Sequence, residues 1–270
     1  MVHRLLLGSL VTISLFATPL VPGLAAQSPG AIVAVGGGGT TDAIVKRTLE
    51  LAGGSGAVVV VLPQSSAVPG AGDSSVKMWL EAGARSAQKV DFAAPGARAA
   101  LEAATLIWMP GGDQNRFMKA IEGTGLDEAI RARHRAGAVV GGTSAGAAVL
   151  SRLMMTGDAD LKSLAPGKTV LAKGLGLLPD VIVDQHFLQR QRNNRLLSAV
   201  LDHPTVVGVG IDEATAAIFR NGTIEAVGRS AVVVFDPRGA KVEKAGDGSA
   251  ITAIGIQTAV LREGMKLTLR

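Results

Sequence analysis

The sequence predicts an α/β protein with a doubly wound, mostly parallel sheet that has an antiparallel extension in its C-terminal part. Within residues 28–150, short apolar runs recur, each followed by a glycine or proline turn and then by a stretch of helical periodicity. The runs are continuous rather than alternating, which indicates parallel strands buried on both faces. Helices must then cover both faces, as they do in a doubly wound fold.

The N-terminal half supplies the parallel strands. The predicted strands are residues 31–35, 57–62, 104–109 and 137–142, with 89–92 a weaker candidate, and the predicted helices include 41–51, 76–82, 115–121 and 126–135. Residues 63–75, which are rich in serine, proline and glycine, are expected to form a surface loop.

Closely spaced apolar runs after residue 182 predict the antiparallel extension. These runs are residues 206–211, 216–220, 223–228 and 231–235. Asn221 and Gly222 between two of them are a strong hairpin signal, because both residue types tolerate a positive φ. We therefore expect these strands to extend the same sheet, and residues 27–270 to form a single domain.

The first 26 residues have the layout of a secretory signal peptide. A basic start at Arg4 precedes an apolar stretch, two prolines and small residues, so cleavage is expected near Ala25 or Ala26. An uncleaved membrane anchor is the alternative, since the apolar stretch is almost long enough to span a bilayer. The leader predicts a secreted or periplasmic protein.

Composition excludes several classes of site. The chain has no cysteine, so disulfides, thiolate metal sites and a cysteine nucleophile are excluded together. Its formal net charge is +5, but only 3% of its residues are aromatic and tyrosine is absent, so stacking platforms for nucleic acid are few. We expect no nucleic-acid partner, and a hydroxyl nucleophile if the protein is an enzyme.

Ligands of open α/β sheets bind beyond the carboxyl ends of the strands, so the residues after each apolar run are the candidates for chemistry. The segment GGTSAGA puts Ser144 at a strand-to-helix turn, where its oxygen is exposed and Ala145 N–H can stabilise an oxyanion. A tight helix–sheet crossing that needs small residues is the alternative explanation. The segment PGGDQ offers Gly112 N–H as a second oxyanion donor and Gln114 as a partner for an amide.

Two further strand ends carry a candidate base and acid. His186 follows a β-branched run, whereas the other three histidines lie in the leader, in a charged helix and before a proline. A histidine that is merely buried in the core is the alternative. Asp212 or Glu213 could orient the imidazole. The order Ser144, His186, Glu213 differs from the serine, acid, histidine order of α/β-hydrolases, so the arrangement belongs to another family.

Five segments, VVVLPQSS, WMPGGDQ, GGTSAGAAVLS, DQHFLQRQRNNRL and VGIDEATA, have an order and spacing that resemble the cyanophycinase branch of the S51 serine peptidases. These peptidases are related to the aspartyl dipeptidases and to the class I glutamine amidotransferase fold, so the resemblance implies a flavodoxin-like sheet. It also implies Ser144 as nucleophile, His186 as general base and Glu213 as the third member. Asp158 competes with Glu213 for that last role.

The same resemblance implies a substrate and the residues that hold it. The family hydrolyses cyanophycin, multi-L-arginyl-poly-L-aspartate, to β-Asp-Arg dipeptides, and we expect no metal or other cofactor. Arg195 and its neighbours are expected to neutralise an aspartyl carboxylate, and Asp184 and Gln114 to accept the guanidinium group. The positions that match the family's oxyanion hole and substrate site are Gly112, Ala145, Gln114, Asp184, Gln185, Arg190, Arg192 and Arg195.

Several expectations remain open. If residues 187–197 are helical, Arg192 and Arg195 share one face, which suits carboxylate recognition, although a basic surface helix is the alternative. The glycine run 36–39 lacks the lysine and spacing of a phosphate loop, so we expect a structural or substrate-facing turn. The family suggests a homodimer. Two other functions are an aspartyl or isoaspartyl dipeptidase of the same family and a catalytically silent module that binds acidic ligands.

Overall fold

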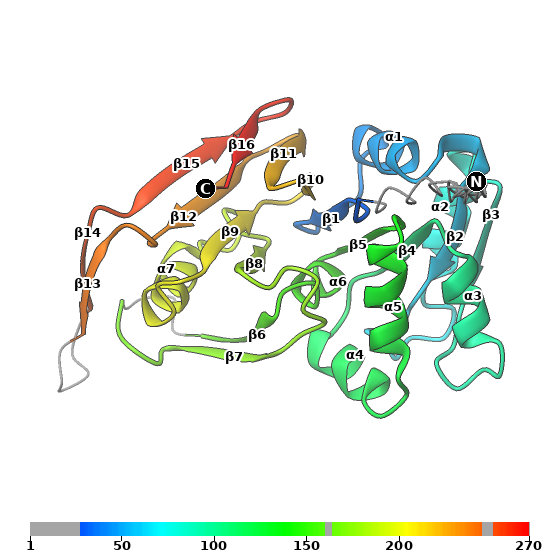
Figure 1. Ribbon diagram of the computed structural model, residues 1–270, viewed down its shortest axis with the longest axis horizontal. Coiled ribbons are helices and arrows are strands. Elements are labelled where there is room, and N and C mark those ends of the chain that lie inside the picture. Colours follow the sequence, from blue (N-terminus) through cyan, green and yellow to red (C-terminus); the bar gives the residue numbers. More distant parts are fainter. Residues whose placement is uncertain (1–27, 160–163, 245–250, 270) are drawn as a thin grey trace, which may run out of the picture.

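The computed structural model describes residues 28–159, 164–244 and 251–269 (Figure 1). The expected signal peptide, residues 1–26, lies outside these described residues. Within them, no helix combines the length and the apolar character needed to cross a membrane.

The larger of two main sheets has eight strands in the order β16-β11-β10-β1-β5-β4-β2-β3. Strands β1, β5, β4, β2 and β3 are parallel, whereas β10, β11 and β16 are antiparallel and form the extension that the sequence predicts. Asn221 and Gly222 make the turn between β10 and β11, with φ values of 50° and 72°. The strands are β1 (Ile32–Val35), β2 (Val58–Val61), β3 (Ser86–Lys89), β4 (Leu106–Met109), β5 (Val139–Thr143), β10 (Thr215–Arg220), β11 (Thr223–Gly228) and β16 (Lys266–Thr268).

Helices cover both faces of the parallel strands, because successive side chains of a strand point to opposite faces. Val33 and Val35 of β1 belong to one core cluster with α1 and α2, whereas Ile32 and Ala34 belong to another with α3, α4 and α5. The predicted doubly wound α/β class is therefore confirmed. The helices are α1 (Asp42–Leu51), α2 (Asp73–Glu81), α3 (Ala97–Ala103), α4 (Gln114–Ile121), α5 (Leu126–Arg135) and α6 (Ala145–Ala148), and Gly54–Gly56 form a 3₁₀ turn.

A second sheet of four strands, in the order β15-β12-β9-β8, stands beside the first (Figure 1). Residues 206–211 and 231–235 are expected in the first sheet, but here β9 and β12 pair with each other in the second. The reason is that β9 also pairs in parallel with β8, a partner that the hydrophobic pattern alone does not reveal. The remaining strands are β6 (Leu153–Ala159), β7 (Thr169–Lys173), β8 (Val181–Gln185), β9 (Val207–Ile211), β12 (Val232–Asp236), β13 (Lys241–Lys244), β14 (Ile251–Ile254) and β15 (Gln257–Leu261).

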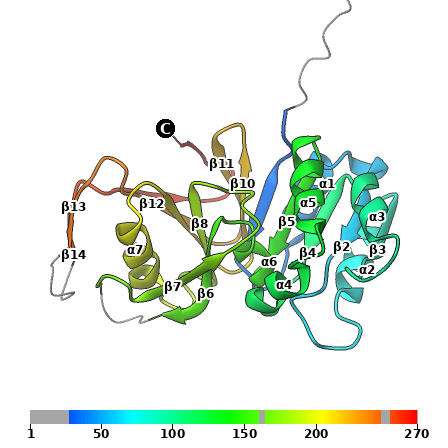
Figure 2. The ribbon, with the colours of Figure 1, turned by 60° about the horizontal axis from the view of Figure 1, so that its bottom comes forward.

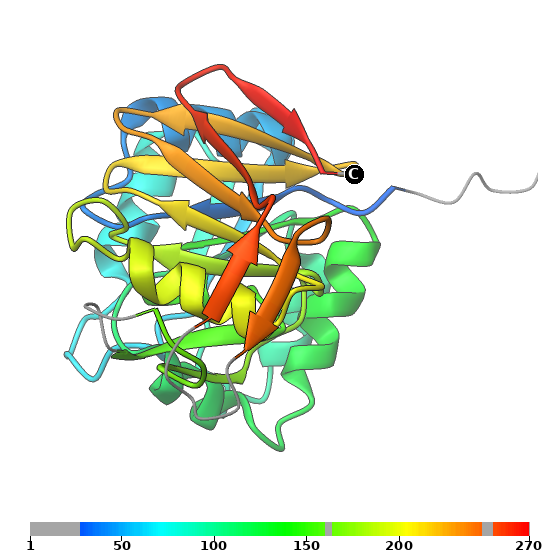
Figure 3. The ribbon, with the colours of Figure 1, turned by 90° about the vertical axis from the view of Figure 1, so that its left-hand side faces the viewer.

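Helix α7 (Asn193–Asp202) packs between the second sheet and the β6–β7 hairpin (Figure 2). The β13–β14 hairpin crosses its outer side, where Lys244 Nζ pairs with Asp202 Oδ1 at 3.0 Å (Figure 3). The helix begins later than the expected residue 187, because the chain first turns through Gln191, which has a φ of 52°. Strand β3 lies earlier than the expected 89–92 and is an edge strand whose side chains are largely exposed.

Candidate active site

Ser144 lies at the turn between β5 and α6, beyond the carboxyl end of β5. Its backbone has a φ of 54° and a ψ of −113°. Non-glycine residues rarely adopt such a conformation, which costs about 1–3 kcal/mol. Its N–H donates to Val35 O at 2.9 Å, which helps to hold the strained turn. A strained strand-to-helix turn of this kind presents the serine oxygen clear of the backbone, as in a nucleophile elbow.

Packing explains the small residues on both sides of Ser144. An added Cβ on Gly142 or Gly146 would collide with the backbone of Met109 in β4. Helix α6 therefore crosses the sheet at a distance that only glycine permits at these positions. The two explanations of this segment are compatible, since the close crossing accounts for the glycines and also creates the turn that exposes the serine.

His186 and Glu213 continue a line of hydrogen bonds from Ser144. Ser144 Oγ is 3.0 Å from His186 Nε2, and His186 Nδ1 is 2.5 Å from Glu213 Oε1. When Nδ1–H donates to the carboxylate, Nε2 is left to accept the serine hydroxyl proton. A hydroxyl, an imidazole and a carboxylate in this sequence of contacts have the geometry of a nucleophilic triad.

The chain that follows β1 holds all three members in place. Gly36 O accepts His186 N–H at 2.7 Å, and Gly37 O accepts the N–H of Ala214 at 2.8 Å. Both residues that donate have positive φ values, 49° for His186 and 53° for Ala214. Together with the Val35 carbonyl that accepts Ser144 N–H, three successive carbonyl groups therefore fix the strained backbone of Ser144, of His186 and of Ala214, the residue after Glu213.

Gly37 and Gly38 pack directly against the histidine and the acid. An added Cβ on Gly37 would overlap the His186 ring, and one on Gly38 would lie 2.7 Å from Glu213 Oε2. Gly39 has a φ of 104°, similar to the 94° of Gly37, but an added Cβ there would meet no atom within 4 Å. The glycine run, expected to be a structural or substrate-facing turn, thus lies against the cluster.

The loop after β4 and the start of α6 lie next to the serine. An added Cβ on Gly111 would lie 3.4 Å from Ser144 Cβ, so this glycine borders the serine. Within the described part of the chain, neither Gly112 N–H nor Ala145 N–H donates a hydrogen bond. Amide donors beside a nucleophile are the components of an oxyanion hole.

Asp184, Gln185, Arg192 and Arg195 form a buried network that starts directly before His186. Asp184 is fully buried and accepts two hydrogen bonds from Arg195. Arg195 Nε donates to Asp184 Oδ2 at 2.7 Å, and Arg195 Nη2 donates to Asp184 Oδ1. Arg192 Nη1 donates to the backbone carbonyl of Gln185 at 2.5 Å and to its side-chain Oε1 at 2.9 Å. Asp184 and Arg195, expected to bind opposite charges of a substrate, instead pair with each other.

This network contains more positive than negative charge. Arg192 Nη1 is 3.6 Å from Asp184 Oδ1, so Arg192 shares this carboxylate with Arg195. Burial, reinforced by the charge of Arg195, lowers the pKa of Arg192 to about 10, and the group stays protonated at neutral pH. Because Arg192 and Arg195 share the one carboxylate of Asp184, the buried charge of Arg192 favours an anionic group on a ligand. Arg190, by contrast, is exposed.

Gln114, expected to contact a substrate amide, binds the backbone of β6. Its side chain is buried, and Nε2 donates to the carbonyl groups of Met155, at 2.9 Å, and Thr156. Gln114 therefore joins the start of α4 to β6. The backbone of Asp158 also belongs to β6, but its side chain lies outside the described part of the chain.

Of the two adjacent carboxylates after β9, Glu213 contacts the histidine and Asp212 caps a turn. Asp212 Oδ1 accepts the N–H groups of Leu188 and Gln189 at 3.1 and 3.0 Å, and Oδ2 accepts the Ser230 hydroxyl at 2.7 Å. Burial raises the pKa of Asp212, but these hydrogen bonds outweigh burial and hold the pKa below its ordinary value. Asp212 thus stabilises the chain that carries His186.

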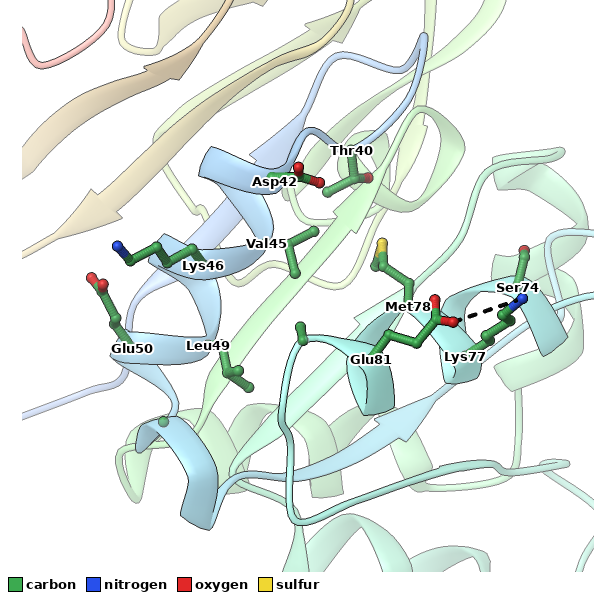
Figure 4. Close-up of a pocket in the computed structure, with 12 residues that line it drawn as sticks. Thr40, Asp42, Val45, Lys46, Leu49, Glu50, Ser74, Lys77, Met78 and Glu81 are labelled. Atoms are coloured by element: carbon green, nitrogen blue, oxygen red, sulfur yellow. Dashed lines mark ion pairs between the residues drawn. The ribbon is translucent and has the colours of Figure 1, made fainter.

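Away from the cluster, a cavity of about 720 Å³ lies between α1 and α2 (Figure 4). Val45, Leu49 and Met78 supply apolar walls, and Lys77 pairs with Glu81 at 3.7 Å. None of the three residues of the cluster lines this cavity, so its size does not locate the chemistry. Among the described residues, no group of three or more histidine, aspartate or glutamate side chains is arranged to hold a metal ion.

Three residues at or near the cluster are absent from the sequence-based candidates: Gly37 and Gly38, which pack against it, and Ser65, which binds the loop beside Ser144. The signal for the two glycines was a run of four glycines at the end of a predicted strand, where close backbone approach is common. Ser65 also follows a predicted strand, but its position in a serine- and proline-rich segment favours a surface loop. The structure instead buries it to 2% exposure.

The line of contacts through Ser144, His186 and Glu213, at the carboxyl end of a doubly wound sheet, has the geometry of a hydrolase of the serine type. Residues 32–227 match the family model described as Peptidase family S51, and the chain belongs to this family. It is accordingly a serine-type peptidase, as the five sequence segments predict.

Relatives at substantial identity carry the name cyanophycinase. The cyanophycinase of Geminocystis herdmanii is 39% identical over 202 residues, which cover 72% of this chain and 74% of the relative. That of Trichormus variabilis is 37% identical over 203 residues, covering 72% and 68%. That of Thermosynechococcus vestitus is 39% identical over 228 residues, covering 77% and 69%.

Solved structures share the fold at lower identity. A peptidase from an acI-B1 Actinobacterium superposes with a TM-score of 0.67 at 20% identity, over 90% of this chain and 98% of that one. A putative peptidase E protein from Listeria monocytogenes superposes with a TM-score of 0.56 at 17% identity, over 75% of this chain and 100% of that one.

Proposed function

We propose that this protein is an exported serine peptidase that hydrolyses cyanophycin to β-Asp-Arg dipeptides through an acyl-enzyme. The observation that carries the proposal is the line of contacts from Ser144 Oγ through His186 to Glu213, on a strained turn of an S51 peptidase. Relatives 37–39% identical that carry the name cyanophycinase support the choice of substrate.

In the first half of the reaction, Ser144 Oγ attacks the scissile carbonyl carbon while His186 Nε2 takes the hydroxyl proton. The carbonyl oxygen becomes an oxyanion, which the Gly112 and Ala145 N–H groups stabilise. Glu213 holds the Nδ1–H tautomer and stabilises the imidazolium. His186 then gives the proton to the leaving amine, the carbon–nitrogen bond breaks, and an ester to Ser144 remains.

In the second half, water replaces the amine. His186 takes a proton from the water as its oxygen attacks the ester carbon, and the same two N–H groups stabilise the second oxyanion. Collapse returns the proton to Ser144 Oγ and releases the carboxylic acid. Each half uses the one imidazole as base and then as acid, so no other titrating group is needed.

The excess positive charge of the buried network supports recognition of an aspartyl carboxylate. Arg192 is the cation that shares its carboxylate, and it donates to Gln185, the residue before His186 in the chain. Asp184 and Arg195 are already paired, so in this proposal their contribution is to hold Arg192 and the start of α7. Exposed Arg190 is free to meet a second carboxylate of the polymer.

Insoluble cyanophycin and mass spectrometry of the soluble products test the proposal. We expect the wild-type protein to release β-Asp-Arg and Ser144→Ala to release none. Release by neither protein would contradict the polymer as substrate. A panel of aspartyl and isoaspartyl dipeptides then decides between a narrower peptidase, which would hydrolyse some of them, and a silent module for acidic ligands, which would hydrolyse none.

Export and assembly belong to the same proposal and have separate tests. Secretion of the full chain, followed by N-terminal sequencing, should give a mature protein that begins at Ala26 or Gln27; retention of Met1 in the membrane fraction would instead indicate an anchor. Sedimentation of the mature protein should give the mass of a homodimer. A monomeric mass would contradict that expectation without affecting the chemistry.

A further inference from the structure

Ser65 is a buried polar residue at the carboxyl end of the sheet that the proposed mechanism does not use. It follows β2 in the segment expected to be a surface loop, yet only 2% of the residue is exposed. Its hydroxyl lies 2.9 Å from Pro110 O and 2.8 Å from Gly111 O. Its own carbonyl accepts the N–H of Asp113 at 2.8 Å. Ser65 therefore makes three contacts with the loop after β4.

These contacts fix the orientation of two peptide groups. In a planar trans peptide the C=O and the following N–H point in opposite directions. Because the carbonyls of Pro110 and Gly111 point toward the Ser65 hydroxyl, the N–H groups of Gly111 and Gly112 point away from Ser65. Gly111 also borders Ser144, because an added Cβ on Gly111 would lie 3.4 Å from Ser144 Cβ.

Gly112 fits closely against the same serine. Its φ of 144° is in the range that favours glycine, and an added Cβ would collide with the backbone carbonyl of Ser65. The loop is thus shaped to Ser65 both by hydrogen bonds and by contact. Substitution of Ser65 by alanine removes the hydroxyl that the Pro110 and Gly111 carbonyls share.

We propose that Ser65 is a positioning residue for the oxyanion hole: by binding the Pro110 and Gly111 carbonyls, it holds the Gly112 N–H toward the developing oxyanion. This inference rests on the proposed function, since it needs an oxyanion at Ser144. Ser65 does not touch the reacting atoms. Without its hydroxyl, the Pro110 and Gly111 carbonyls lose their hydrogen-bond donor and the Gly111–Gly112 peptide is held less firmly. A rotated peptide would present a carbonyl oxygen where a donor is needed.

The test uses Ser65→Ala, with Ser66→Ala as the matched control. Ser66 is the next residue, and its hydroxyl accepts the exposed Val68 N–H at 3.2 Å. The first readout is the rate at which a fluorophosphonate reagent inactivates the protein, because its tetrahedral adduct on Ser144 needs the same donors and no particular substrate. Loss of one oxyanion donor costs about 10²–10³-fold in rate, so loosening one should slow inactivation by roughly 10–100-fold.

The second readout separates positioning from a purely structural role. On a hydrolysed aspartyl peptide, Ser65→Ala should lower kcat by the same factor and leave KM within about threefold, because the donors act on the transition state. Ser66→Ala should match the wild type in both assays. An unchanged inactivation rate for Ser65→Ala, or equal losses for the two variants, would overturn the inference.

Two controls keep the result interpretable. If Ser65→Ala does not fold, Ser65→Cys, which keeps a weak donor of similar size, is measured instead and should show a smaller loss of the same kind. If the wild type hydrolyses no aspartyl peptide but still reacts with the fluorophosphonate at Ser144, the substrate proposal fails while the inactivation rates still decide the role of Ser65.

Discussion

Replacing Gly37 by alanine should disable the protein while leaving it folded. The new methyl group would occupy the space of the His186 imidazole ring, because the Cβ position of Gly37 overlaps that ring. His186 is held by a backbone bond to Gly36 O and by Glu213, so the ring can move only by breaking its contact with Ser144 or with the acid. Either movement removes the general base from the reaction.

The expected loss follows from what a general base contributes. Positioned proton transfer supplies about 10²–10⁴-fold in rate. At 1.36 kcal/mol for each factor of ten, Gly37→Ala should raise the barrier by about 2.7–5.4 kcal/mol. The backbone cost is separate, since an alanine forced to a φ near 94° loses about 1–3 kcal/mol of folding free energy.

Gly39→Ala is the matched control. Gly39 has a φ of 104°, so alanine there suffers a comparable backbone strain, but its added Cβ meets no atom within 4 Å. Both variants should therefore lose unfolding free energy through backbone strain, and Gly37→Ala should lose more, because its methyl group also displaces the His186 ring. For Gly37→Ala, the rates of fluorophosphonate inactivation and of β-Asp-Arg release should fall by about 10²–10⁴-fold. For Gly39→Ala, both rates should stay within about threefold of wild type.

Equal activity of folded Gly37→Ala and Gly39→Ala would contradict this prediction. That outcome would mean that the His186 ring tolerates displacement or that backbone strain alone controls the rate. Gly38→Ala provides an independent check, because its methyl group would meet Glu213 instead of the imidazole. The loss of activity in Gly38→Ala should resemble the loss of activity in Glu213→Gln.

Three further predictions concern stability. Arg195→Ala leaves the carboxylate of Asp184 buried with its main partner removed, so the free energy of unfolding should fall by about 3–5 kcal/mol, and a loss below 1 kcal/mol would contradict the buried pair. Hydrogen bonds hold the pKa of Asp212 below its ordinary value near 3.8. Its contribution to stability is therefore complete above that pH and is lost as the pH falls through the folded-state pKa. In urea unfolding, Asp212→Asn should lack this loss of unfolding free energy at acid pH. Burial lowers the pKa of His134, and its bond to Gly30 O offsets part of this effect. The contribution of neutral His134 to stability is therefore complete above about pH 6.5 and declines as the pH falls toward the folded-state pKa. His134→Gln should remove this decline, and identical pH profiles of unfolding free energy for the variant and the wild type would contradict the prediction.

Much of the fold follows from local pattern. The helix Leu126–Arg135 and the hairpin at Asn221 and Gly222 lie where periodicity and turn chemistry predict them. Strand pairing was less accessible, since β9 and β12 form a separate sheet although their apolar runs resemble those of the first. The start of α7 was also displaced, because the left-handed turn at Gln191 is set by contacts of the chain around His186 rather than by helix propensity.

The sequence alone determined the fold class and the strand ends that carry Ser144, His186 and Glu213, because hydrophobic periodicity and turn residues act over a few positions. Which polar groups meet depends on how the sheets and helices pack. This packing pairs Asp184 with Arg195, and it turns Glu213 toward the imidazole and its neighbour Asp212 toward a backbone turn. Such pairings depend on the directions of side chains from segments far apart in the chain, and these directions exist only once the sheets have packed.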